Sequence, residues 1–428
     1  MKKLFSFLAV VALMIGGARA EEMKPFTLQQ AQAAAIQHHP RISEAELIAL
    51  AAKQVVREAQ SAYFPVATAN ATAVDSTASN TRIAAGGLNN PLILTREADG
   101  VNVSQLITDF GRSINLTASS KLQARAQEQN ALATRAEILL AVNTAYFEAL
   151  QAQSILTVAK QTVSTRQLTY DQVSELASNK LKSGLDVSFA KVDLASSKLL
   201  LANAGNDLQA SFATLSNVLG ERVQQNYLLV DQPVTTNTVP ADSELVQTAL
   251  RNRPDIIQLR LQKDAAGRFA RAEKDLQYPT VSAIGSAGVV PLHDESLRAN
   301  YAAAGVNVSV PIFDGMLFSA REREAELRER ASEEVLRDAE DNVIRDVRIA
   351  GLNLNYAAQR LTLTEELLES ANESFELAQA RYKVGSSSIV ELSQAQLNQT
   401  EAEIAQARAK YEYQTRTSIL NFQLGQNP

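Results

Sequence analysis

The sequence predicts a mainly α-helical protein with a few transmembrane β-strands, built from one structural unit that occurs twice. The run GVNVS from Gly100 to Ser104 recurs from Gly305 to Ser309, and a shift near 205 residues carries most of the chain onto itself. No proline lies between Pro91 and Pro233, and the next long proline-free stretch, 312–427, is also rich in Ala, Leu, Gln and Glu. Such composition is typical of long helices.

Residues 1–20 have the features of a secretory signal peptide. Lys2 and Lys3 supply the positive start, an apolar run follows, and Ala18-Arg19-Ala20 is a small-residue cleavage site. We therefore expect an exported mature chain that begins at Glu21. No later stretch is long and apolar enough for a membrane helix, so any crossing of a membrane must use strands.

Charge and cysteine content exclude several classes of protein. Removal of the signal peptide leaves 38 basic and 47 acidic residues, which argues against a nucleic-acid partner. Without cysteine there is neither a disulfide nor a thiolate metal site nor a cysteine-linked lipid anchor. His38 and His39 are adjacent and diverge, and His293 lies in an expected loop, so we expect no metal. No nucleophile or phosphate-binding motif occurs, so we expect neither an enzyme nor a cofactor.

Each unit is expected to begin with two helices separated at a proline and to continue with two strands, because the apolar period changes from 3.6 to 2 residues. The helices are expected at 27–39, 41–62, 243–252 and 255–276, and the strands at about 65–75, 100–108, 280–290 and 301–312. Polar, turn-rich segments, 76–99 and the residues around His293, join the strands. Each strand is close to the ~9–11 residues of a tilted transmembrane strand.

A long helical hairpin follows each strand pair, at 112–220 and 316–425. Its first helix has roughly 65 residues, which corresponds to on the order of 100 Å. Alternating steps of four and three residues predict a coiled-coil seam in both copies. The seam positions are Val343, Val347, Ala350, Leu354, Ala357 and Leu361, with Ile138, Val142, Ala145, Ala149, Ala152 and Leu156 as partners at the shift of 205. We therefore divide the mature chain into a first repeat, 21–220, a linker, 221–242, and a second repeat, 243–428.

Four strands are too few to close a membrane barrel. An open edge in hydrocarbon leaves backbone N–H and C=O groups unsatisfied, and the smallest single-chain barrels use about eight strands. The barrel must therefore be shared among chains under cyclic symmetry. A dimer supplies eight strands and a trimer twelve, and the residues alone do not choose between them.

The duplicated layout and several short runs resemble the TolC-like outer membrane factors, the outer membrane efflux protein family. The runs are VPIFDG at 310–315, YKVGS at 382–386, IVEL at 389–392 and KSGLDV at 182–187. The resemblance covers essentially the whole mature chain. It implies a homotrimer whose twelve-stranded β-barrel lies in outer-membrane lipid of a Gram-negative bacterium, continuous with a periplasmic α-helical barrel that tapers to a gated tip.

The function implied by the resemblance is a passive exit duct of a tripartite efflux or type I secretion system. Its partners would be a periplasmic adaptor, also called a membrane fusion protein, and an inner-membrane efflux pump or ABC exporter. One alternative is a secreted trimeric coiled-coil protein with a structural or adhesive role, but that class predicts no duplicated strand pairs. Another is the adaptor itself, which would normally need one hairpin where this chain has two.

The resemblance also places the pore gate at the hairpin turns. Glu391 stands where an aspartate is usual, and Asp186 is its counterpart in the first copy. A ring of such acids would favour cations, although both residues also suit the start of a helix. Tyr382 retains a latch tyrosine. Gln394 replaces a possible second acid, and Ser387 replaces a possible latch arginine.

The resemblance further suggests contact with the adaptor through the tip residues Val384, Gly385 and Ser386. A helix C-cap would explain Gly385 equally well. Aromatic residues at the strand ends fit a membrane-interface girdle or, alternatively, ordinary packing where sheet meets helix. These aromatic residues are Tyr63, Phe64, Phe110, Tyr278 and Phe313.

Overall fold

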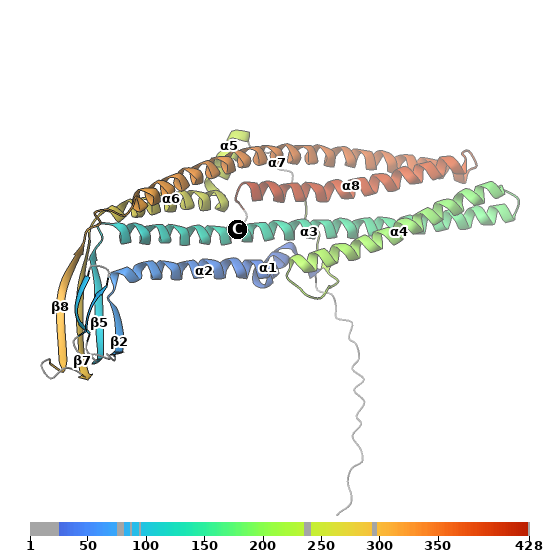
Figure 1. Cartoon of the computed structure of the whole chain (residues 1–428). Helices are drawn as coiled ribbons and strands as arrows, with labels where there is room; N and C mark the ends of the chain where they lie inside the picture. The colour runs from blue at the N-terminus through green and yellow to red at the C-terminus, as the bar shows by residue number, and fades with distance from the viewer. Residues whose placement is uncertain are drawn as a thin grey trace, which may run out of the picture.

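The computed structural model describes residues 25–74, 81–85, 88–93, 96–234, 241–292 and 298–426. The signal peptide expected at 1–20 and the expected loop residue His293 lie outside these ranges. The molecule is elongated, with a β-sheet at one end and two helical hairpin turns at the other (Figure 1). Two pairs of shorter helices lie along the half nearer the sheet. Among the described helices, none is both long enough and apolar enough to cross a membrane.

The helices of the two copies match in length, and equivalent helices are 214 residues apart before the strands and 205 after them. In the first copy they are α1 (Leu28–His38), α2 (Pro40–Gln60), α3 (Arg112–Ser178) and α4 (Gly184–Val218). In the second copy they are α5 (Asp242–Asn252), α6 (Pro254–Lys274), α7 (Leu317–Lys383) and α8 (Ile389–Gln423). Both α3 and α7 have 67 residues. Proline begins α2 and α6 because the first helical position needs no N–H donor.

One antiparallel sheet joins the strands of both copies, in the order β2-β5-β7-β8. Its strands are β2 (Val66–Val74), β5 (Arg96–Thr108), β7 (Thr280–Leu292) and β8 (Asn300–Ser309). The register gathers polar side chains on one face, among them Thr68, Asn70, Asn102, Ser286 and Asn307. The opposite face carries apolar side chains, among them Ala69, Val101, Val103, Ala287 and Val306.

The structure differs from the expected strands in three places. The expected loop 76–99 contains a separate two-stranded sheet, β3 (Thr81–Ala85) with β4 (Leu88–Ile93), and the start of β5. Pro91 lies where the register of this pair shifts, at an irregularity that tolerates proline in a strand. The strand expected to reach 312 ends at Ser309, since Pro311 cannot donate to a ladder.

A further pair of strands was not expected. It is the short parallel pair β1 (Pro25–Phe26) and β6 (Leu228–Leu229), and β6 lies in the segment expected to be a linker. Two residues are too few to show a period in the sequence.

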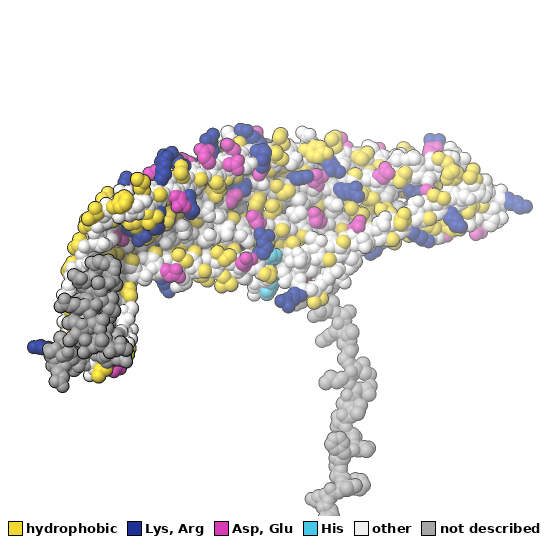
Figure 2. Space-filling view, viewed as in Figure 1, with side chains coloured by type: hydrophobic (Ala, Val, Ile, Leu, Met, Phe, Trp, Pro, Cys, Tyr) yellow, Lys and Arg dark blue, Asp and Glu magenta, His cyan; other side chains and the backbone are white. Residues whose placement is uncertain are grey.

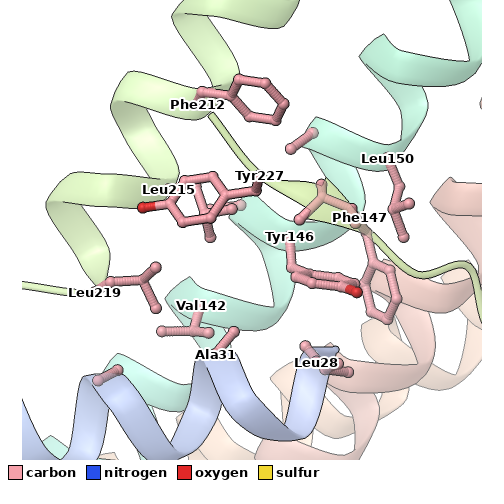
Figure 3. Packing of buried hydrophobic residues seen from close by; sticks show 14 of the residues in the cluster. Leu28, Ala31, Val142, Tyr146, Phe147, Leu150, Phe212, Leu215, Leu219 and Tyr227 are labelled. Carbon is pink, nitrogen blue, oxygen red and sulfur yellow. The ribbon is translucent and has the colours of Figure 1, made fainter. Parts of the chain in front are cut away.

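Equivalent residues build the hydrophobic core in each copy. Val142 and its partner Val347 are both fully buried on the expected seams, and Leu215 and Leu420 cover them from the return helices. The first core is larger and contains more aromatic residues, several of which Figure 3 shows packed between α1, α3 and α4. There the Tyr146 hydroxyl lies 2.8 Å from the carbonyl oxygens of both Phe26 and Val230. The linker is thereby fastened to α3.

Candidate functional site: the hairpin turns

The two hairpin turns have the same backbone but different residues at its left-handed position. In the second turn Gly385 has φ +79° and the Ser386 N–H donates to the Arg381 carbonyl oxygen at 2.8 Å. In the first turn Lys180 has φ +62° and the Leu181 N–H donates to the Leu176 carbonyl oxygen at 2.9 Å. Both are helix C-terminal motifs of the Schellman kind. A side chain at this φ is strained, so the first turn carries strain that the second avoids.

The return helices begin with serine caps, and here the two acidic residues differ. The Ser183 hydroxyl accepts the Asp186 N–H at 3.2 Å, and the Asp186 carboxylate accepts the Ser183 N–H at 3.1 Å. This reciprocal capping box uses Asp186 within its own turn. The Ser388 hydroxyl accepts the Glu391 N–H at 3.2 Å.

Glu391 instead pairs with a residue that sequence reasoning missed. Its carboxylate lies 3.2 Å from the Arg381 guanidinium, and both side chains are about half exposed. Such a pair is weak in water, but the guanidinium offsets part of the negative charge that a bare glutamate would present. The only signal in the sequence was a basic residue in the last turn of the preceding helix.

Tyr382 links the two turns. Its ring is buried with Val173 and Ala190 of the first hairpin, and the Lys182 ammonium lies 4.4 Å from the ring centroid, in a cation–π contact. The hydroxyl is buried and has no hydrogen-bond partner among the described residues. Burial raises the pKa of Tyr382 above its usual 10, and the nearby charge of Asp186 raises it further.

Ser387 and Gln394, the two positions expected to depart from the gate pattern, take no part in a gate contact within one chain. The Ser387 hydroxyl is buried with no hydrogen-bond partner among the described residues. Gln394 is exposed and donates to the side-chain oxygen of Asn398 at 2.8 Å. Among the described residues, neither side chain forms a hydrogen bond with another expected gate residue.

A buried polar contact between the hairpins was also missed. The Arg166 guanidinium of α3 lies 3.0 Å from the Asp193 carboxylate of α4, and the Ser393 hydroxyl of α8 donates to the same carboxylate. Burial lowers the pKa of Arg166, and Asp193 opposes that shift. A cavity of about 520 Å³ adjoins this group and is lined by residues of α3, α4 and α8. In the sequence both charged residues look like ordinary helix-surface positions.

The residues expected to meet an adaptor are exposed. Val384, Gly385 and Ser386 all lie on the surface at the end of the second hairpin. A Cβ added at Gly385 would have no atom within 4 Å, so space alone does not require glycine there. The positive φ favours glycine, although the first turn has Lys180 at the same position.

The five strand-end aromatic residues are exposed where the sheet meets the helices. Phe110 and Tyr278 lie beside each other, with ring centroids 6.3 Å apart. The Tyr63 hydroxyl donates to the Ser113 carbonyl oxygen at 3.2 Å. Phe64 and Phe313 are 66% and 83% exposed, which is unusual for large aromatic side chains. Figure 2 shows charged side chains spread over the helical part of the molecule.

The histidines have a local role where they are described. His39 accepts the Arg41 N–H at 3.2 Å and caps α2. Its pKa is lowered by burial and then by the Arg41 charge. In the described part of the chain no group of three or more His, Asp or Glu side chains could hold a metal ion.

Comparison with known proteins gives a consistent result. The chain is 25% identical over 431 residues to the outer membrane protein TolC of Escherichia coli, covering 96% of this chain and 84% of that protein. It is 25% identical over 360 residues to the cobalt-zinc-cadmium resistance protein CzcC of Cupriavidus metallidurans, covering 81% and 78%.

Solved structures share the fold. The outer membrane protein VceC of Vibrio cholerae matches with a TM-score of 0.78 at 19% identity, over 93% of this chain and 96% of that one. The open state of the MtrE channel of Neisseria gonorrhoeae matches with a TM-score of 0.79 at 20% identity, over 93% and 88%. The family model described as "Outer membrane efflux protein" matches residues 32–221 and 245–426, so the chain belongs to the outer membrane efflux protein family.

Proposed function

We propose that three copies of this chain form the exit duct of a tripartite efflux or type I secretion system. One observation carries the proposal: a four-stranded sheet with one apolar face continues directly into helices of 67 residues. In the described residues β2 and β8 are each paired on one side only. An apolar face suits lipid, and the two open edges need partners in other chains.

Three chains supply twelve strands, with β2 of one protomer beside β8 of the next. The family relationship favours the trimer over a dimer of eight strands. The polar face of the sheet then faces the lumen and the apolar face faces lipid. The exposed aromatic residues at the strand ends would form a girdle at the periplasmic interface of the outer membrane.

The helical part would cross the periplasm and receive cargo at the hairpin turns. An adaptor and an inner-membrane pump or ABC exporter would be its partners, and they would supply the energy and select the cargo. The duct itself performs no chemistry in this proposal.

At the tip, Glu391 is the more exposed of the two acids and pairs with Arg381, whereas the Asp186 carboxylate is engaged in its capping box. Three Glu391 carboxylates near the axis would favour cations. Three Arg381 guanidinium groups would weaken that preference, since each lies 3.2 Å from a carboxylate.

The test is planar-bilayer recording of the purified protein in a salt gradient. Glu391→Ala should move the reversal potential toward zero, and Arg381→Ala should move it toward stronger cation preference. Asp186→Asn, which keeps a side chain able to cap, is the matched control and should leave the potential unchanged. Unchanged potentials in both Glu391→Ala and Arg381→Ala would remove the tip from ion selection.

The adaptor contact has its own test. Gly385→Glu should abolish drug resistance in cells while the trimer still assembles. Two variants serve as controls for Gly385→Glu. Gly385→Ala adds the same backbone strain without the large charged side chain, and Lys180→Glu places the negative charge on the other turn. Full resistance in Gly385→Glu would rule out an adaptor contact at this glycine.

A further inference from the structure

One row of residues across the sheet is unlike its neighbours. Asn70, Gly100, Gly288 and Tyr301 lie opposite one another on β2, β5, β7 and β8. Tyr301 is the only aromatic residue in the described strands of this sheet. It belongs to the polar face, together with Asn102, Ser286 and Asn307.

The tyrosine ring lies flat on the two glycines. A Cβ built on Gly100 would overlap the Tyr301 hydroxyl and lie 3.1 Å from its Cζ atom. A Cβ on Gly288 would lie 2.6 Å from the same hydroxyl oxygen. The side chain therefore starts on β8, crosses β7 and ends over β5, which is possible only because neither strand has a side chain there. Both glycines have ordinary extended backbone, so conformational freedom does not explain them.

We infer that this glycine pair keeps Tyr301 against the wall and thereby sets the free width of the duct near its outer end. The inference rests on the proposed function, in which the polar face lines the lumen. Three such rings would lie in the trimer. A ring lifted off the wall would point toward the axis and obstruct bulky cargo more than small ions.

Gly100 offers the cleaner test. At Gly288 an added Cβ would also overlap the backbone carbonyl oxygen of Asp99, which cannot move without disturbing the sheet. At Gly100 the overlap is with the far end of the tyrosine, and the Ala287 carbonyl oxygen is 3.0 Å away. Gly100→Ala should therefore displace the ring and leave the strands in register.

The experiment uses the natural absence of cysteine. Ser104→Cys places one thiol on the polar face, four residues nearer the helices than Gly100. Intact cells are treated from outside with a small maleimide or with a bulky polyethylene-glycol maleimide. Gly100→Ala should slow the bulky reagent by about tenfold and leave the small reagent unchanged. Gly100→Ala/Tyr301→Ala should restore the bulky reagent, and Tyr301→Ala alone should label as the parent does.

The possible outcomes distinguish a failure of the proposed function from a failure of the inference about Tyr301. If the small reagent never labels Ser104→Cys in the assembled parent, the polar face does not line the lumen and the proposed function fails. If both reagents label the parent and Gly100→Ala equally, Tyr301 does not set the width. If Gly100→Ala prevents assembly, rescue by Tyr301→Ala supports the inference, and no rescue overturns it, since the clash then lies with the Ala287 backbone.

Discussion

The two hairpins have the same length and the same turn geometry, yet only the first has a reciprocal capping box and a buried ion pair near its turn. These are the box of Ser183 and Asp186 and the Arg166–Asp193 pair. The second has Ala371 and Asn398 at the positions equivalent to that pair. Its helices are joined near the turn by the exposed Arg381–Glu391 pair and by the hydrogen bond from Gln399 to Asn372.

The difference teaches how one duplicated unit can have two roles. The two turns differ at more than the acid: the first has Leu176 where the second has Arg381, so Asp186 bonds within its own cap, whereas Glu391 pairs with Arg381 across the turn. A turn whose acid is engaged locally is suited to hold shape. A turn whose acid is exposed is suited to meet ions or a partner.

The largest expected effect is that of Arg166→Ala. It leaves the Asp193 carboxylate beside Ser393 without a cation, and removing one partner of a buried pair costs more than the pair is worth. We expect the free energy of local opening around Arg166 to fall by about 1–3 kcal/mol, seen as faster amide exchange in α3 and α4. Arg381→Ala, at an exposed pair, is the control and should cost less than about 1 kcal/mol. If Arg166→Ala and Arg381→Ala lose the same free energy, the first hairpin is not held more firmly than the second.

At the left-handed position, adding a Cβ to Gly385 and removing the side chain of Lys180 should have different effects on the stability of the two turns. Gly385→Ala should destabilise the second turn by about 1–2 kcal/mol, because it puts a Cβ at φ +79°. Lys180→Gly should change the first by less than about 1 kcal/mol, because relief of strain is offset by the entropy of glycine. Exchange of the Ser386 and Leu181 amides reports each turn. A large loss in Lys180→Gly would show that lysine is favoured there for another reason.

The serine caps offer a smaller contrast. Ser388→Ala should cost about 0.5–1 kcal/mol, the usual value of a lost cap. Ser183→Ala should cost about the same, because it removes the equivalent hydroxyl bond and the Asp186 carboxylate still accepts the backbone N–H of residue 183. Exchange rates of the Glu391 and Asp186 amides measure the two effects. A clearly greater loss in either variant would contradict the equivalence of the two serine caps.

The smallest expected effect concerns Tyr382. Its pKa is raised in the folded protein, so its contribution to stability is complete below pH 10 and declines as pH rises through the folded pKa. Asp186→Asn should lower that pKa toward 10 by removing a nearby negative charge. Ultraviolet titration, taken as the difference from Tyr382→Phe, measures it. No change in Asp186→Asn would leave burial as the whole cause.

Duplication and proline distribution predicted the helices and the strand pairs closely, because both leave long-range marks in a sequence. The β3–β4 pair was not predicted, because the polar, turn-rich composition of 76–99 indicated a loop. The roles of Arg381 and Arg166 were not predictable, because each depends on which helix face meets which across a turn. Asp186 and Glu391 looked equivalent at a shift of 205, but Glu391 has the cation Arg381 across its turn where the first copy has Leu176.

The identical 67-residue length of α3 and α7 restricts how such a chain can change during evolution. One inserted residue would rotate everything beyond it by about 100° and take the seam out of contact, whereas seven would restore the face and add about 10 Å. A matching insertion would be needed in the other copy to keep both turns level. Tolerated insertions should therefore be found in whole heptads and in pairs, while the β2–β5 connection accepts single residues freely.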